Sequence, residues 1–499
     1  MSDYRVDWLP TLSSPELVEK ANQVVKEIMD SREDNQRGAS DTTRTTKYQH
    51  IALRVISALY QAHFDSDSVS YPLKTSAYHK SKPGKVHLSH EYSTDVYEKL
   101  IGLGWITVTG APVAKEKYTT IAAAGALDRF FSDLGLRWMP QEPLPDVLRD
   151  VKRDSDGIPK RSPKSKKTTK TDLVTPDNEV VAQYRENLRE INALLIQHCI
   201  SIDLKNDNFM ALQQELSNRT EDADSFRSLQ LHRVQLVRIF ARGSLSKGGR
   251  FYRGWWQSIP ATHRPHLRID GKKVVEVDYS GISIRICNAL LGKPLNVDSD
   301  PYDIGLADWI PKEDPRRKTL KKVINAMIND EDGIYRISKT DTETLGVDEN
   351  EIRRLFKATH PELYRELGNG IGLKSQFVDS QIAEQVMLRM LKEGTVCLPI
   401  HDSFIVRIGE QHRLCTVMKE EFRKQTSADT TVDVDGIKVN EHFGMKTKDV
   451  EELSKQPYAG LVDNDKLMKS VMEYDQQITN RFVSYWERWV IATGRLWVD

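Results

Sequence analysis

The run from Leu398 to Ile408, LPIHDSFIVRI, places a carboxylate inside an otherwise apolar stretch. Apolar residues flank His401, Asp402 and Ser403 on both sides, which predicts two short strands joined by a turn at or near Asp402. A carboxylate in such surroundings is costly unless a cation or hydrogen bonds compensate its charge. The alternative is a tight turn in which the aspartate hydrogen-bonds its own backbone. The run therefore predicts a pair of strands in which Asp402 either binds a metal ion or hydrogen-bonds the backbone of its own turn.

A second carboxylate stands at the end of another predicted strand. Val274, Val275 and Val277 favour a strand that ends near Asp278, and a helix is expected from Ser283. Two carboxylates from separate strands suit a two-metal site, in which ions roughly 3.5–4 Å apart clamp the attacking and leaving oxygens of a displacement. Nucleases, phosphatases and polymerases all fit that arrangement, so a third element is needed to choose between them.

The segment 315–330, PRRKTLKKVINAMIND, predicts a basic helix, and Pro315 suits its first turn. Several of its cations project from one side, because they lie three to five positions apart: Arg317, Lys318, Lys321 and Lys322. Between two metal-binding carboxylates, such a helix suits the triphosphate of an incoming nucleotide. The alternative is a solvated basic face.

Composition excludes few classes of protein. The 499 residues suffice for roughly two to four domains. The 72 basic and 72 acidic residues cancel, which neither supports nor excludes nucleic-acid binding. The four cysteines form no C-x-x-C pair, so we expect no zinc site and a cytoplasmic location. We also expect no signal peptide and no membrane partner, because no basic and apolar leader and no apolar run of about 18 residues is present.

Residues 1–150 predict a separate module. We expect helices over 48–64, 93–103 and 122–134, with two short strands around 105–109 and 117–121. Helix, strand, basic loop, strand and helix is the order of a winged helix, and the stretch resembles the wing of bacterial winged-helix proteins. Lys115 and Lys117 would then lie near DNA phosphates. The alternative is a small module that binds protein.

The remaining boundaries follow from changes in composition. Residues 151–180 are basic and almost free of large apolar side chains, which predicts a flexible linker that either contacts nucleic acid or serves as a tether. Residues 181–247 predict a helical, thumb-like region, with helices over 180–200 and 225–240. Residues 248–449 would form a palm with reduced fingers, and residues 450–499 a helical tail.

Five segments resemble, in order and approximate spacing, the motifs of family A DNA polymerases and phage-type single-subunit RNA polymerases. In chain order they are Gly249-Arg250 with Gln257-Ser-Ile-Pro260, Asp278-Tyr-Ser-Gly-Ile-Ser-Ile-Arg285, Lys322-Val-Ile-Asn325, Phe377-Val-Asp-Ser-Gln381 and His401-Asp402-Ser403. The resemblance covers about 160 residues, one third of the chain. It implies an α+β fold: a right-hand palm with an antiparallel sheet, helical fingers and thumb.

The resemblance also implies roles for individual residues. Asp278 and Asp402 would be catalytic and bind two Mg²⁺ ions (Mn²⁺ could substitute), with the backbone carbonyl of Tyr279 assisting. The residues implied at the nucleotide are Arg317, Lys318, Lys322, Ser283 and Ala326. Those implied at the nucleic acid are Arg250, Gln257, Gln381 and His401. The expected partners are DNA, as primer–template or single-stranded template, and nucleoside triphosphates.

The chain departs from the family pattern at the sugar and base sites. Ser283 stands where the DNA polymerases carry a glutamate that blocks a ribose 2′-OH, so weak discrimination against ribonucleotides is expected. Ala326 and Asp330 replace an aromatic residue and a tyrosine, which puts the stacking platform in doubt.

The function that follows is template-directed polymerisation from a 3′-OH. The alternatives are an RNA polymerase or primase-like enzyme, a catalytically inactive DNA-binding initiator or regulator, and a two-metal nuclease.

Overall fold

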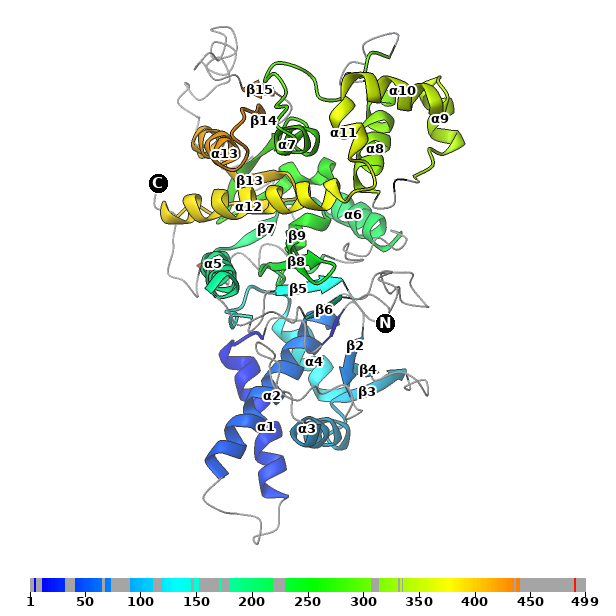
Figure 1. Ribbon diagram of the computed structural model, residues 1–499. Helices are drawn as coiled ribbons and strands as arrows, with labels where there is room; N and C mark the ends of the chain where they lie inside the picture. The colour runs from blue at the N-terminus through cyan, green and yellow to red at the C-terminus, as the bar shows by residue number, and fades with distance from the viewer. Residues whose placement is uncertain are drawn as a thin grey trace.

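The computed structural model describes residues 4–5, 11–31, 41–64, 68–72, 90–110, 118–144, 148–151, 170–172, 179–218, 229–306, 314–330, 333, 335–434, 437–439 and 489–490. Within these ranges the strands form three sheets, and helices cover them (Figure 1). The expected mixture of helices with an antiparallel sheet is confirmed. The identity of this sheet as a right-hand palm remains a prediction.

The N-terminal part, blue at the bottom of Figure 1, packs helices against a small sheet. The sheet has the order β1–β2–β4–β3, with β1 at Tyr4–Arg5, β2 at Val69–Pro72, β3 at Ile106–Gly110 and β4 at Tyr118–Ala123. The helices are α1 (Pro15–Asp30), α2 (Asp41–His63), α3 (His90–Gly102) and α4 (Gly125–Leu134). Ser14 caps α1 by accepting the Leu17 N–H, and Pro15 fits the first turn.

The predicted order of helix, hairpin and helix is present as α3, β3, β4 and α4. Apolar residues at helical spacing explain the predicted helix over 48–64, because Tyr48, Ile51, Val55 and Leu59 all lie in the core of this part. Its identity as a winged helix and its contact with DNA remain predictions. Lys115 and Lys117 lie outside the described residues.

A second sheet, with the order β6–β5–β8–β9, lies in the middle of the chain. Its strands are β5 (Leu148–Val151), β6 (Lys170–Asp172), β8 (Val237–Ala241) and β9 (Ser244–Tyr252). β6 pairs antiparallel with β5, so the end of the predicted linker 151–180 contributes a strand; residues 152–169 and 173–178 are outside the described ranges.

The expected helix over 225–240 is wrong. Residues 229–236 form no helix, and 237–241 form β8, whose residues are all buried. The short apolar run reads equally well as a buried strand, because periodicity alone does not separate the two. Residues 181–247 are therefore a mixed region, with α5 (Glu179–Leu195), β7 (Ile200–Ile202) and α6 (Asn206–Asn218) preceding β8.

The third and largest sheet carries both aspartates. β11 (Lys272–Tyr279) lies at its centre and pairs antiparallel with β10 (Leu267–Ile269), β13 (Ser403–Arg407) and β14 (Val432–Val434). β12 (Leu398–Ile400) pairs with β13, β7 with β10, and β15 (Ile437–Val439) with β14. Two short 3₁₀ helices, Trp255–Ser258 and Ala261–His266, lead into β10.

Helices cover this sheet and extend beyond it. α12 (Ile371–Lys392) packs on α13 (Gln411–Thr426) and on α7 (Ile282–Leu290). A separate apolar cluster joins α7 to α8 (Pro315–Asn329), α9 (Lys339–Leu345), α10 (Glu349–Thr359) and α11 (Pro361–Arg365). In Figure 1 these helices lie at the upper right, next to the sheet. The arrangement brings the basic helix α8 close to the end of β11.

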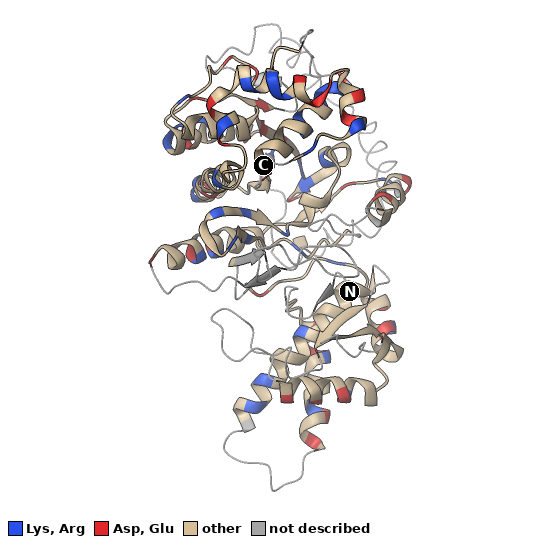
Figure 2. Cartoon of the chain, turned by 45° about the vertical axis from the view of Figure 1, so that its right-hand side comes forward, with Lys and Arg blue, Asp and Glu red and all other residues tan. Residues whose placement is uncertain are grey.

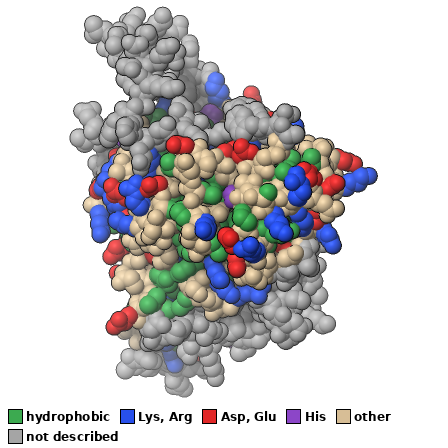
Figure 3. Space-filling model, turned by 45° about the horizontal axis from the view of Figure 1, so that its top comes forward, with side chains coloured by type: hydrophobic (Ala, Val, Ile, Leu, Met, Phe, Trp, Pro, Cys, Tyr) green, Lys and Arg blue, Asp and Glu red, His purple; other side chains and the backbone are tan. Residues whose placement is uncertain are grey.

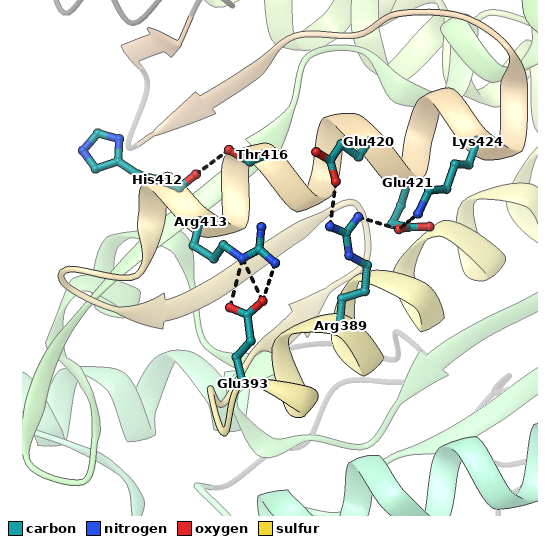
Figure 4. A network of polar contacts seen from close by, with 8 residues as sticks. All are labelled: Arg389, Glu393, His412, Arg413, Thr416, Glu420, Glu421 and Lys424. Carbon is teal, nitrogen blue, oxygen red and sulfur yellow. Dashed lines mark hydrogen bonds and ion pairs between the residues drawn. The ribbon is translucent and has the colours of Figure 1, made fainter.

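Ion pairs bind α12 to α13 at the surface (Figure 4). Arg389 lies 2.6 Å from Glu420 and 2.7 Å from Glu421, and Glu421 also accepts from Lys424 at 2.7 Å. Arg413 pairs with Glu393. These contacts fix the two helices behind the sheet, and we assign them a structural role.

The cysteines of the chain are buried thiols and form no disulfide. Cys199, Cys287, Cys397 and Cys415 are all free and buried, and burial raises the pKa of the Cys397 thiol.

Gly249 marks a close approach between β9 and α12. A Cβ at this position would lie 2.9 Å from Ser380 Oγ and 3.0 Å from a Phe240 ring carbon, at a φ of +83°. We expect Gly249→Ala to lower the free energy of unfolding by about 2–4 kcal/mol, measured by denaturant unfolding. Gly292→Ala is the matched control, because its φ is +70° and its Cβ would meet nothing within 4 Å. Equal losses in the two variants would contradict the packing argument.

Candidate active site

Asp278 occupies the penultimate position of β11, between two neighbouring strands. It lies opposite Ser403 of β13 and opposite Asp433 of β14. The alternation of β11 buries Val277 and Tyr279 and leaves Asp278 on the open side. Because Asp402 directly precedes Ser403, the register of β11 and β13 brings the two predicted carboxylates together.

Asp402 lies in the turn between β12 and β13, as expected. The turn needs a left-handed residue, and His401 supplies it with a φ of 54°. The backbone carbonyl of Asp402 accepts the Tyr279 N–H at 3.3 Å, which ties the turn to the end of β11. The predicted pair of strands with Asp402 in its turn is therefore present in the structure.

The charges of the two aspartates interact. The surrounding protein reduces the hydration of Asp278, although the residue remains open to solvent. This loss of hydration, together with the negative charges of Asp402 and Glu276 and against the opposing charge of Lys321, raises the pKa of the Asp278 carboxyl to about 8. Glu276 is itself engaged, since it lies 2.8 Å from Arg264 and accepts from Ser403 Oγ at 2.5 Å. Acidic groups that repel one another in this way favour a nearby cation.

A cavity of about 140 Å³ opens beside Asp278. Its lining combines carboxylates with cations and the start of α7: Asp278, Tyr279, Ser280, Gly281, Asp300, Pro301, Tyr302, Arg317, Lys321 and Asp433. Gly281 begins α7 without a side-chain cap, so the cavity meets the uncapped N-terminus of a helix.

The cations of the cavity come from α8. Asp314 caps this helix by accepting the Arg316 N–H, and Arg317 and Lys321 then lie one turn apart on the side that faces the cavity. Arg317 is 7% exposed and pairs with Asp300. The guanidinium of Arg317 and the ammonium of Lys321 lie 5.5 and 5.3 Å from the centre of the Tyr302 ring.

Two of the cations predicted at the nucleotide point elsewhere. Lys322 Nζ lies 2.8 Å from Asp341 of α9, and Lys318 is exposed; neither lines the cavity. The reason is the helical period, since successive residues differ by about 100° in direction and Lys321, not Lys322, lies one turn after Arg317. In Figure 2 the positions of basic and acidic residues alternate along the helices of this part, and Figure 3 shows side chains of both charges mixed on the surface.

Ser283 and Ala326 do not line the cavity either. Ser283 is half-buried on α7, and its carbonyl accepts the Ser375 hydroxyl at 3.3 Å. Ala326 is half-buried on α8. Asp330 follows α8 and accepts the Tyr335 N–H at 2.7 Å. The predicted effect of Ser283 on sugar choice remains a prediction.

The four residues predicted at the nucleic acid divide into two pairs. Gln257 donates to the Phe251 and Pro399 carbonyls, each at 3.0 Å, and Gln381 lies 3.5 Å from the Tyr184 hydroxyl. Both glutamines therefore have contacts within the protein.

His401, by contrast, lies beside Asp402 in the turn between β12 and β13, and Arg250 interacts electrostatically with Asp402. His401 is exposed with its ring 5.8 Å from that of Tyr252, and Arg250 pairs with Asp379 at 2.6 Å. Tyr279, predicted to offer its backbone carbonyl, lines the cavity while its hydroxyl donates to the Met418 carbonyl at 2.7 Å.

Lys321 was named among the cations of the predicted helix but was not assigned to the nucleotide, and sequence reasoning missed Asp300, Tyr302 and Asp433. The i, i+4 spacing of Arg317 and Lys321 was a usable signal. Asp433 lies in the alternating run TVDVD, which favours a strand. Nothing local points to Asp300 or Tyr302, because the loop after α7 brings them to the cavity.

The carboxylates present suit a hard divalent cation. Among the described residues no group of three or more His, Cys, Asp or Glu side chains could hold a metal. Asp278 and Asp402 could hold Mg²⁺ if water, phosphate and a backbone carbonyl completed the coordination, and Mg²⁺ commonly binds through one or two carboxylates plus substrate phosphates.

Comparisons with known proteins give a limited likeness. No protein-family model and no curated protein sequence matches the chain. One similar solved structure is the POL domain of Pol1 from M. smegmatis in complex with DNA primer-template and dNTP. It is 17% identical over 41% of this chain, with a TM-score of 0.27, and the match spans 47% of the length of that structure. No described helix has both the length and the apolar character needed to cross a bilayer.

Proposed function

We propose that this chain is a nucleotidyltransferase that extends a nucleic-acid 3′-OH with nucleoside triphosphates under the direction of a template. The observation that carries the proposal is the cavity at the end of β11. There Asp278, Arg317 and Lys321 line one cavity of about 140 Å³, and Asp278 interacts electrostatically with Asp402, which lies outside the lining. A metal-bound triphosphate requires carboxylates and cations side by side in this way.

The chain's own residues would divide the work as follows. Asp278 and Asp402 would hold Mg²⁺, which when bound supplies charge neutralisation and orientation of the reacting phosphate. Arg317 and Lys321 would balance the charge of the remaining phosphates. The uncapped N-terminus of α7 after Gly281 would offer backbone N–H groups to phosphate oxygens.

A whole nucleotide needs more room than the cavity offers. Sites for small ligands usually have volumes of about 300–1,000 Å³. Arg317 and Asp300, which both line the cavity, pair with each other. Binding a triphosphate would therefore open this pair and move α8 relative to the loop that carries Asp300.

The test is extension of a labelled primer on DNA and RNA templates, with four dNTPs or four rNTPs and Mg²⁺. We expect the wild-type protein to extend the primer and Asp402→Ala to leave it unextended. A wild-type protein that extends no primer and starts no chain on single-stranded template would contradict the proposal. A protein that shortens the primer would indicate a nuclease.

Sugar selection gives a second prediction. Because Ser283 lacks a side chain long enough to block a ribose 2′-OH, we expect kcat/KM for rNTPs to lie within about 100-fold of that for dNTPs. Ser283→Glu should increase the preference for dNTPs. A wild-type preference for dNTPs of several orders of magnitude would defeat the idea.

A further inference from the structure

An ion pair between a buried carboxylate and a partly exposed arginine lies near the turn that carries Asp402. Asp379 of α12 is 3% exposed, and its Oδ2 accepts the Nε–H of Arg250 from β9 at 2.6 Å. Among the described residues, the hydrogen bonds of the Arg250 side chain engage Nε, so the two Nη groups point to no acceptor within the protein. The guanidinium is thus held from one side.

The seam between β9 and α12 fixes both members of this pair. Arg238, which is fully buried, donates to the Gly249 carbonyl at 2.8 Å, to Ser380 Oγ at 3.1 Å and to Glu384 at 3.0 Å. Gly249 and Ser380 are the chain neighbours of Arg250 and Asp379. Arg238 therefore anchors the backbone beside Arg250 and the side chain beside Asp379.

The pair lies within electrostatic reach of Asp402. Burial and the charge of Asp402, against the opposing charge of Arg250, raise the pKa of Asp379 to about 6. Burial lowers the pKa of Arg250, but Asp379, Tyr252 and Asp402 together raise it above its ordinary value. Even so, no ion pair within 4.0 Å joins Arg250 to Asp402 in the part of the chain that the structure describes. Arg250 is close enough to interact with Asp402 and is held back from it.

We propose that Asp379 is a positioning residue that holds the guanidinium of Arg250 away from Asp402, so that Asp402 stays available to a divalent cation. This inference rests on the proposed function, because it concerns the same metal ligand. An arginine that loses its partner is free to pair with another carboxylate within reach, and arginine forms strong paired hydrogen bonds with carboxylates. Asp402 is the acidic group, besides Asp379, that interacts with Arg250. An arginine on Asp402 would compete directly with the metal.

A purely structural role makes a different prediction. If Asp379 serves only to stabilise the seam, its loss lowers the melting temperature and leaves the affinity of the folded protein for metal unchanged. Glu384 is the matched control, because it pairs with the fully buried Arg238 on the same helix and interacts with no residue of the catalytic turn. Glu384→Gln should lower the melting temperature without weakening metal binding.

The experiment measures Mn²⁺ binding to the metal-free full-length protein by the EPR signal of free Mn²⁺, without nucleotide or DNA. We expect Asp379→Ala to weaken Mn²⁺ binding about 10-fold, and the double variant Arg250→Ala with Asp379→Ala to restore it to near the wild-type value. Asp379→Asn keeps an acceptor oxygen but loses the charge, and it should weaken Mn²⁺ binding about 3-fold. This variant replaces Asp379→Ala in the test if Asp379→Ala does not fold.

Wild-type affinity in Asp379→Ala or, where that variant does not fold, in Asp379→Asn would overturn the inference. A double variant as weak as Asp379→Ala alone would do so as well. These outcomes can be told apart from a failure of the proposed function. If the Mn²⁺ affinities change as expected but the protein extends no primer, the role of Asp379 is supported and the polymerase function is contradicted. If the protein extends primers but the variants bind Mn²⁺ as the wild type does, the polymerase function is supported and the role of Asp379 is contradicted.

Discussion

Asp278→Asn is expected to reduce primer extension by at least about 1,000-fold while the protein stays folded. The asparagine keeps the size of the side chain and its place opposite Ser403 and Asp433, but it removes the negative charge that would hold Mg²⁺. The loss should therefore appear in kcat under saturating nucleotide and primer. Single-nucleotide incorporation, followed by denaturing gel electrophoresis, measures it directly.

The same variant should melt at a higher temperature than the wild type in the absence of metal. Loss of hydration and the negative charges of Asp402 and Glu276 together raise the pKa of Asp278 to about 8, which means that the site disfavours its charge, and the substitution removes this unfavourable charge. Asp298→Asn is the matched control, since Asp298 is exposed and lies outside the cavity lining. It should change neither property. Near-normal extension by Asp278→Asn would remove this residue from the chemistry.

The second large effect is expected on nucleotide use, from Arg317→Ala and from Lys321→Ala. Each should lower kcat/KM for the nucleoside triphosphate by about 10–100-fold, because each removes a cation that faces the carboxylates across the cavity. We expect the larger loss for Arg317, which is 7% exposed and better shielded from water. Steady-state kinetics with varied nucleotide at fixed Mg²⁺ measure both losses.

Lys322→Ala tests whether Lys321, which lines the cavity, or Lys322, which the sequence motif indicates, contacts the nucleotide. The motif Lys322-Val-Ile-Asn325 points to Lys322, whereas the structure pairs Lys322 with Asp341 and places Lys321 at the cavity. We expect Lys322→Ala and Lys318→Ala to change kcat/KM by no more than about 3-fold. A larger loss in Lys322→Ala than in Lys321→Ala would show that α8 turns its other lysine inward during the reaction.

Local patterns explain why the two aspartates could be predicted from the sequence. The β-branched run before Asp278 and the apolar run around Asp402 each favour a strand, and a polar residue at a strand end has few alternatives to a turn or a cleft. Their proximity also needed the register of β11 with β13, which pairs Asp278 with Ser403. Register depends on the whole sheet and was not predicted, so the expectation that the two aspartates share one site came from the resemblance to family A polymerases.

Other features depend on tertiary contacts that no local pattern encodes. The strand β8 was predicted as a helix, because a short apolar run that is buried on both faces looks the same in either conformation. Asp300 and Tyr302 reach the cavity from a loop, where periodicity gives no direction. The pair between Arg250 and Asp379 joins residues 129 positions apart, so only the packing of β9 on α12 could reveal it.

The central claim is that Asp278 and Asp402 share a divalent cation, and anomalous scattering from Mn²⁺ in a crystal of the protein tests it most directly. We predict a peak within about 2.5 Å of a carboxylate oxygen of each residue. A crystal with Mn²⁺ bound elsewhere, or with the two carboxylates turned away from each other, would contradict the account.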